Sequence, residues 1–165
     1  LLSVAIDGRE LANNEYRLNE TELLLHSVPE QFQLTIVTEI NPRANKALSG
    51  LYQSGQILCT QNEAEGFRRI TFFQDRPDVM ANFSVTLRAD PTLFPVLLSN
   101  GNLMSQGKLD DGRHFAHWVD PHKKPSYLFA LVAGQLVCRE QRIVARSGKE
   151  HLLQSIYLNR IAGII

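Results

Sequence analysis

The chain has 165 residues, of which 17 are Lys or Arg and 17 are Asp or Glu, so its formal net charge at neutral pH is zero. A balanced charge gives no positive field that would attract nucleic acid or an anionic membrane surface, and we expect neither as a partner. Hydrophobic residues make up 44% of the sequence. A chain of this size buries enough apolar surface to fold as one domain without a disulfide or a metal.

The sequence also bears on the cellular setting of the protein. No apolar run approaches the roughly 18 residues that a membrane-spanning helix needs. Residues 1–6 are followed at once by charged residues, which is unlike a signal peptide. Cys59 and Cys138 stand far apart and neither belongs to a CxxC pair, so we expect two free thiols and a cytoplasmic location.

Turn-forming residues recur along the chain and separate segments in which apolar residues alternate with polar ones. The alternation is clearest in residues 32–40 and 83–89, and residues 113–119, 127–133 and 151–158 follow the same pattern. This pattern predicts about ten short strands joined in antiparallel hairpins. We therefore expect an all-β fold, an antiparallel β-sandwich or a pair of saddle-like sheets.

Residues 63–80 form the one segment with helical character. Phe67, Ile70 and Met80 are its apolar positions, and Asp75 is placed to act as an N-cap with an acidic residue three positions later. We predict one or two short helical turns there.

A polar segment around Gln61, Asn62 and Glu63 is the most suggestive part of the sequence. If this segment is extended, Gln61 and Glu63 face one side and Asn62 faces the other. An amide and a carboxylate on one face can together hold an ammonium group. The alternative is a solvated loop whose acidic residues pair with Arg68 or Arg69.

The histidines and the tryptophan do not indicate a site. His114 and His117 would point to opposite sides of a strand, and His122 adds no ligand at zinc-site spacing, so we expect no metal site in this chain. Trp118 is expected to be a core or interface residue rather than a ligand platform. The chain has no nucleophile elbow and no phosphate-binding glycine loop, so we expect no catalytic residue from these motifs.

Several long blocks of the sequence resemble the bacterial aminopeptidase N family, and they occur in the order in which that family shows them. Together they cover nearly all of residues 1–158. The blocks are residues 47–55, 59–69, 75–79, 95–102, 112–114, 124–134 and 146–150.

The resemblance implies a role for the polar segment. Glu63 matches the acidic residue that helps to anchor the free α-ammonium group of a peptide substrate, and Gln61 matches a neighbouring glutamine of the substrate cleft. Asn62 departs from the cysteine that is common in bacterial members. A buried carboxylate would also reject blocked amino termini, because it would then be left unpaired.

The catalytic motifs of the family, HExxH and GxMEN, are absent from this chain. The resemblance implies that residues 1–160 form the amino-terminal β domain of a zinc aminopeptidase and that the catalytic domain is absent. Zinc would act in the full-length enzyme, with no cofactor in this chain. We therefore expect the fragment alone to be inactive, and its partners to be its own catalytic domain and the amino terminus of a peptide.

Two alternatives belong to other classes. The first is a free-standing β-sandwich interaction module without peptidase activity. The second is a carbohydrate-binding module, which would need exposed aromatic platforms, whereas Trp118 is the only tryptophan. The apolar residues 161–165 could form a binding stripe. The simpler expectation is that they normally continue into a longer chain, which would account for exposed isoleucines at this end.

Overall fold

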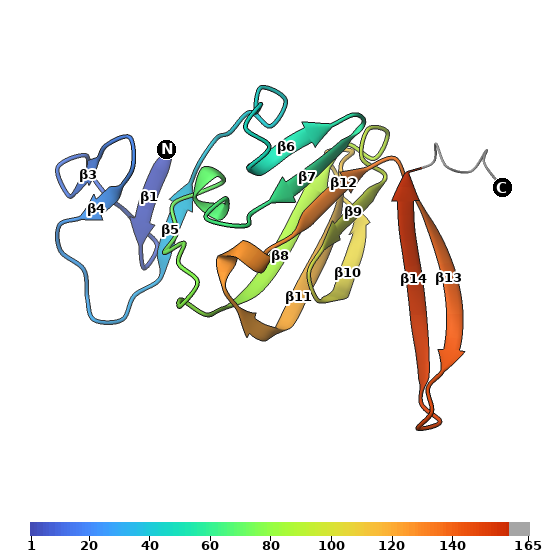
Figure 1. Cartoon of the computed structure of the whole chain (residues 1–165). Coiled ribbons are helices and arrows are strands. Elements are labelled where there is room, and N and C mark those ends of the chain that lie inside the picture. The colour runs from blue at the N-terminus through green and yellow to red at the C-terminus, as the bar shows by residue number, and fades with distance from the viewer. Residues whose placement is uncertain (159–165) are drawn as a thin grey trace. The chain divides into compact units, whose positions relative to one another are not determined.

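The computed structural model describes residues 1–158, whose regular secondary structure is almost entirely β-strand (Figure 1). This range contains fourteen strands and two short 3-10 helices, η1 and η2. The predicted all-β fold with one or two short helical turns is therefore confirmed. Residues 161–165 lie outside the described part of the chain.

The chain separates into two compact units, and each contains segments that are distant in sequence. The first unit comprises Leu1–Gln53, Thr60–Asn82 and His122–Ala130. The second comprises Ser54–Cys59, Phe83–Pro121 and the chain from Leu131 onward. Both units fall within the span that we expected for a single domain, and that expectation stays a prediction.

The first unit begins with a small antiparallel sheet of order β2-β1-β5 and a separate β3–β4 hairpin. Its core consists of the buried side chains of Val4, Ile6 and Leu11, against which Tyr16 and Leu23 pack. The strands are β1 (Ser3–Ile6), β2 (Arg9–Glu10), β3 (Tyr16–Leu18), β4 (Leu23–Leu25) and β5 (Leu34–Val37).

Two 3-10 helices complete the first unit and lie next to the polar segment. They are η1 (Phe67–Arg69) and η2 (Ser126–Leu128). The Phe67 ring packs edge-on against Phe73 and Phe129, with ring centroids 5.0 and 5.1 Å away. This aromatic contact joins segments that are some sixty residues apart in sequence.

The second unit contains two antiparallel sheets that share one core. In the first sheet the strands pair in the order β7-β12-β9, and in the second in the order β10-β11-β8. The strand β6 (Gly50–Ser54) leads into β7 through a turn at Gly55. The remaining bounds are β7 (Ile57–Gln61), β8 (Ala81–Ala89), β9 (Val96–Ser99), β10 (Asn102–Lys108), β11 (His114–Lys124) and β12 (Leu131–Gly134).

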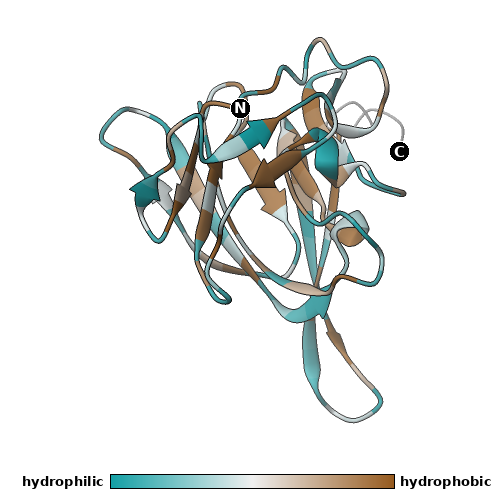
Figure 2. Cartoon of the chain, turned by 90° about the vertical axis from the view of Figure 1, so that its left-hand side faces the viewer, coloured by the Kyte–Doolittle hydropathy of each residue, from teal (hydrophilic) through white to brown (hydrophobic). Residues whose placement is uncertain are grey.

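The core of the second unit lies between these two sheets. Leu97 and Ala133 come from one sheet and Ala116 from the other, and all three are buried. Trp118 packs against this cluster and donates from Nε1 to the Leu97 carbonyl oxygen at 3.1 Å, so its predicted structural role is confirmed. Figure 2 shows the most apolar residues mainly on strands, as expected when one face of each sheet is buried.

A long hairpin of β13 (Leu136–Val144) and β14 (Glu150–Leu158) ends the described part of the second unit. In Figure 1 it extends away from the two sheets of that unit. Most of its side chains are exposed, including those of Val144 and Leu152.

Some strand boundaries differ from the predicted ones. The expected strand 32–40 is only β5, Leu34–Val37, because its partner β1 has just four residues. The first part of the expected strand 127–133 is wrong, because residues 127 and 128 belong to η2 and the strand β12 begins only at Leu131. There Phe129 N donates to the Ser126 carbonyl at 3.0 Å, and this turn bond replaces a bond between strands.

Candidate functional site

The polar segment leaves the sheet at Gln61, the last residue of β7. Gln61 and Glu63 are exposed, whereas Asn62 between them is only 3% exposed. The predicted difference in orientation is therefore seen as a difference in burial, although the strand ends at Gln61, two residues before the expected end at Glu63. Gln61 Nε2 donates to the backbone carbonyl oxygen of Glu63 at 3.3 Å, which holds the two residues together.

The loop that carries Glu63 is tightly closed. Gly66 N donates to the Asn62 carbonyl oxygen at 2.9 Å. Glu65 has a left-handed backbone φ of 65°, which costs a residue with a side chain about 1–2 kcal/mol. The peptide bond between Glu63 and Ala64 is cis. The hydrogen bond from Gly66 to Asn62 makes the loop a defined turn.

Gly66 is required by close packing. A Cβ atom at this position would lie 2.5 Å from the Gln61 carbonyl oxygen and 2.7 Å from the Asn62 Cα atom. Both distances are shorter than ordinary van der Waals contacts, which are about 3.5–4.0 Å. A side chain at position 66 would thus push against the backbone of Gln61 and Asn62, directly before Glu63.

Glu63 lines a pocket with a volume of about 420 Å³. Gln61 is not among its lining residues, so the structure brings only one of the two predicted site residues to this pocket. The other lining residues are Ala64, Glu65, Asp75, Arg76, Pro77 and Tyr127. All of them belong to the first unit.

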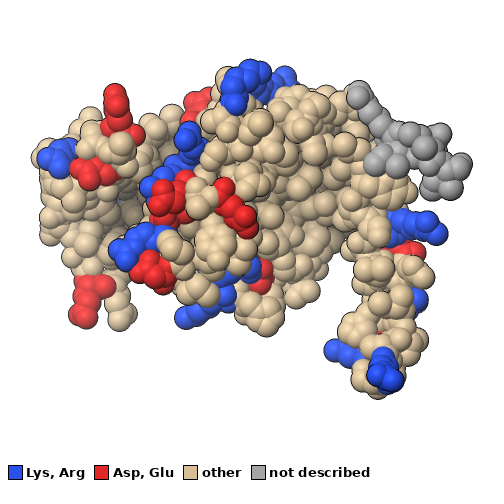
Figure 3. Space-filling model, viewed as in Figure 1, with Lys and Arg blue, Asp and Glu red and all other residues tan. Residues whose placement is uncertain are grey.

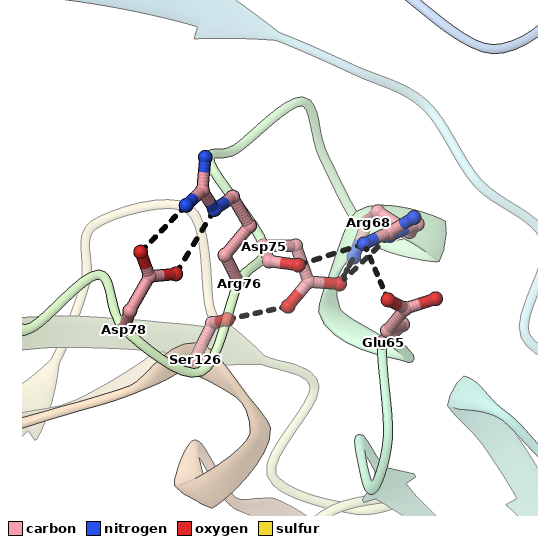
Figure 4. A network of polar contacts seen from close by, with 6 residues as sticks. All are labelled: Glu65, Arg68, Asp75, Arg76, Asp78 and Ser126. Carbon is pink, nitrogen blue, oxygen red and sulfur yellow. Dashed lines mark hydrogen bonds and ion pairs between the residues drawn. The ribbon is translucent and has the colours of Figure 1, made fainter.

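The buried carboxylate of Asp75, which lines this pocket, is at the centre of a network of polar contacts (Figure 4). The Asp75 side chain is 3% exposed and accepts hydrogen bonds from the Arg68 backbone N at 3.0 Å and from Arg68 Nε at 3.2 Å. Ser126 Oγ donates a third, short hydrogen bond to Asp75 Oδ1. The prediction that Asp75 caps a helix is wrong: its carboxylate is used in tertiary contacts, and η1 begins earlier, at Phe67.

Opposing effects act on the pKa of Asp75. Burial favours the neutral acid and raises the pKa, whereas the hydrogen bonds from Ser126 and Arg68, together with the positive charge of Arg68, lower it. The net pKa lies below the ordinary value for an aspartate. Asp75 is therefore ionised near neutral pH and acts as a hydrogen-bond acceptor.

The acidic residues of the loop differ in their partners. Glu65 pairs with Arg68 at 3.4 Å, as the solvated-loop alternative expected, but both side chains are largely exposed, so the pair contributes little to stability. Within residues 1–158 no ion pair involves Glu63. The Glu63 carboxylate is thus available for a ligand.

The histidines of β11 diverge as predicted. His114 lies on the same side of the strand as the buried Ala116, with Nε2 2.7 Å from the Phe94 carbonyl oxygen. His117 lies on the other side, with Nε2 2.9 Å from Ser84 Oγ. No group of three His, Cys, Asp or Glu side chains in the described part of the chain could hold a metal ion. Cys59 and Cys138 are free cysteines.

Two further observations concern the surface charge and the helices of the described residues. On the face shown in Figure 3, acidic and basic side chains lie interspersed. Within residues 1–158 no helix is long and apolar enough to cross a membrane.

Several pocket residues were not predicted from local patterns. Arg76, Pro77 and Tyr127 fall inside two blocks that carry the family resemblance, residues 75–79 and 124–134, which was the available signal. Ser126 lies in the second block as well, but nothing in its local sequence indicates that it contacts Asp75, 51 positions away.

Known proteins resemble this chain over most of its length. The Peptidase M1 N-terminal domain family matches residues 3–128. Aminopeptidase N of Caulobacter vibrioides is 54% identical over 154 residues, 93% of this chain and 18% of that protein. Aminopeptidase N of Escherichia coli is 51% identical over 145 residues, 88% of this chain and 17% of that protein. The chain thus spans less than a fifth of the length of these curated relatives.

Solved structures give the same result. The crystal structure of Legionella pneumophila aminopeptidase A in complex with aspartic acid has a TM-score of 0.86 and 32% identity, covering 98% of this chain and 19% of that one. An M1 zinc metallopeptidase from Deinococcus radiodurans, bound to a Tyr-Ser-Ala substrate, has a TM-score of 0.72 at 18% identity, covering 95% of this chain and 37% of that one, which shows a shared fold. The chain belongs to the Peptidase M1 N-terminal domain family.

Proposed function

We propose that this chain is the substrate-anchoring, non-catalytic part of a zinc metallo-aminopeptidase that removes amino-terminal residues from peptides. The observation that carries the proposal is the exposed Glu63 carboxylate, which lines a pocket and has no ion pair within residues 1–158. An ammonium group bound there would form a charge-assisted hydrogen bond with that carboxylate. Gln61, held next to Glu63 by its own hydrogen bond, would contact the first substrate residue.

The relatives support the class of reaction. They include bacterial aminopeptidases, a structure with a bound amino acid and a zinc metallopeptidase with a bound peptide. Zinc supplies a Lewis acid and an activated water in such enzymes. The described residues offer no set of ligands for it, so the zinc would be held by residues outside this chain. The partner of this chain would be its own catalytic domain, and its two free cysteines support a cytoplasmic location.

The proposal predicts a specific effect of Glu63→Gln in the full-length protein. This substitution removes the charge but keeps the size of the side chain. Glu63 is exposed in this chain, so the relevant pair is the one that a bound substrate would cover, and kcat/KM should fall by a factor that corresponds to about 2–5 kcal/mol. The assay is hydrolysis of an alanine anilide. Glu150→Gln is the control, because Glu150 is also an exposed glutamate but pairs with Arg142 and does not line this pocket. Equal kinetics for wild type and Glu63→Gln would refute the anchoring role.

A second comparison separates the enzyme from the interaction module. Residues 1–165 alone should show no hydrolysis with zinc supplied, while a protein extended by several hundred residues of its own gene should be active. An inactive extended protein would favour the free-standing module.

A further inference from the structure

Two hydrogen bonds connect the region around Glu63 to the segment 126–129, over 67 and 51 positions of sequence. Asn62 contacts the Phe129 backbone, and Asp75 contacts the Ser126 side chain. We propose that the segment 126–129 positions Glu63 for the substrate ammonium group, with Ser126 as a positioning residue that acts through Asp75. This inference rests on the proposed function and adds to it the residues on which the site geometry depends.

The first connection is next to Glu63 in the sequence. Asn62 Nδ2 donates to the Phe129 carbonyl oxygen at 2.8 Å, across 67 positions of sequence. The Asn62 Oδ1 atom is buried and has no hydrogen-bond partner, so this one bond fixes the side chain. Because Asn62 is anchored inside the unit, its neighbours Gln61 and Glu63 are held on the exposed side of the turn.

The second connection reaches the other end of the loop. Ser126 is 1% exposed and donates to Asp75, whose carboxylate also binds the backbone N and Nε of Arg68. Arg68 Nη2 in turn donates to the Asp75 carbonyl oxygen at 2.7 Å and pairs with Glu65. Figure 4 shows these contacts as a continuous series from Ser126 to Glu65, two residues after Glu63.

Ring packing supports the same arrangement. Phe67, the first residue of η1, contacts Phe129 edge-on with ring centroids 5.1 Å apart. The segment 126–129 therefore holds the loop through a hydroxyl, a carbonyl and a ring. Ser126 itself does not line the pocket, which is why its effect must pass through other residues.

A double-mutant cycle in the full-length protein tests the positioning role. Ser126→Ala should raise KM for an alanine anilide about three- to tenfold, the size of losing one hydrogen bond, with a much smaller change in kcat. In the Glu63→Gln background, the same substitution should change KM by less than about twofold, because residues that act through one another are not additive. Trp118→Phe is the control, since it removes a hydrogen bond in the other unit and should be additive with Glu63→Gln.

Hydrogen exchange in the same proteins tests the connection without using activity. Ser126→Ala should speed exchange of the Gly66 and Arg68 amides, whose acceptors are Asn62 and Asp75. Two results would overturn the positioning role alone. One is unchanged exchange at both amides. The other is that Glu63→Gln impairs the kinetics but its effect adds to that of Ser126→Ala. Kinetics that do not respond to Glu63→Gln would overturn the proposed function, and this inference with it.

Discussion

Replacing Gly66 with alanine should destabilise the chain, although the backbone at this position suits alanine. Its φ of −82° and ψ of −23° are helical angles that any residue adopts. On conformational entropy alone, alanine would therefore stabilise the protein by about 0.4–1 kcal/mol. The sign of the measured change thus reports whether the close approach in the loop is real.

The magnitude follows from the distances around the added methyl group. It would lie 2.5 Å from the Gln61 carbonyl oxygen, 2.7 Å from the Asn62 Cα atom and 3.1 Å from the Gly50 backbone N. All three neighbours are backbone atoms, so no side chain can rotate away. Overpacking of this kind costs about 1–3 kcal/mol, which leaves a net loss of about 0.5–2 kcal/mol after the entropic gain.

Calorimetric melting of the 165-residue chain is the assay. A loss of that size should lower Tm by roughly 1–8 °C for a chain of this length. Gly148→Ala is the control, because its Cβ would meet no atom within 4 Å and its φ of +80° isolates the cost of a left-handed backbone. An unchanged or higher Tm for Gly66→Ala would refute the packing argument and the tight loop that depends on it.

Further predictions concern acid stability, thiol reactivity and the second core. The folded-state pKa of Asp75 lies below the ordinary 3.8, so the carboxylate stabilises the fold fully above about pH 4, and this contribution is lost as the pH falls through the folded-state pKa. In urea unfolding between about pH 4 and 2, the free energy of unfolding should therefore fall less for Asp75→Asn than for the wild type. Parallel pH profiles of the two proteins would contradict this. Cys138 is exposed and Cys59 half-buried, so iodoacetamide should label Cys138 first by mass spectrometry, and preferential labelling of Cys59 would contradict the described burial. Trp118→Phe should lower the free energy of unfolding by about 1–3 kcal/mol, since the Leu97 carbonyl loses its donor; a urea titration with no shift in midpoint would rule this out.

Alternation of apolar residues predicted a strand well where the neighbouring strand is long, as for β8, which lies at the edge of its sheet beside the eleven-residue β11. In β8, half-buried and exposed residues alternate along all nine positions, so its pattern was clear in the sequence. Around β5 the alternation of apolar residues extends beyond the strand. A strand ends where its partner ends, and the partner β1 is encoded about thirty residues earlier in the chain, so local sequence does not fix the length of β5. The expected strand 127–133 begins in the sequence at residues that belong to the 3-10 helix η2, Ser126–Leu128.

The substrate-binding role of Glu63 and Gln61 stays a prediction. The family resemblance pointed to the segment around Glu63, and the structure places that side chain at a pocket. It does not place Gln61 there, because β7 ends at Gln61 and the chain turns. Asp75 was assigned to a helix end from its neighbours in sequence, whereas its actual partners include Ser126.

The sequence by itself determined the all-β class, the family, and the location of the polar segment, because alternation, turn residues and motif blocks are all local properties of the chain. Only the tertiary structure decided which groups meet. The bonds from Asn62 to Phe129 and from Ser126 to Asp75 join residues 67 and 51 positions apart. A buried polar group is hydrogen-bonded to whichever partner the fold brings close to it. Local sequence does not indicate which distant residue that partner is.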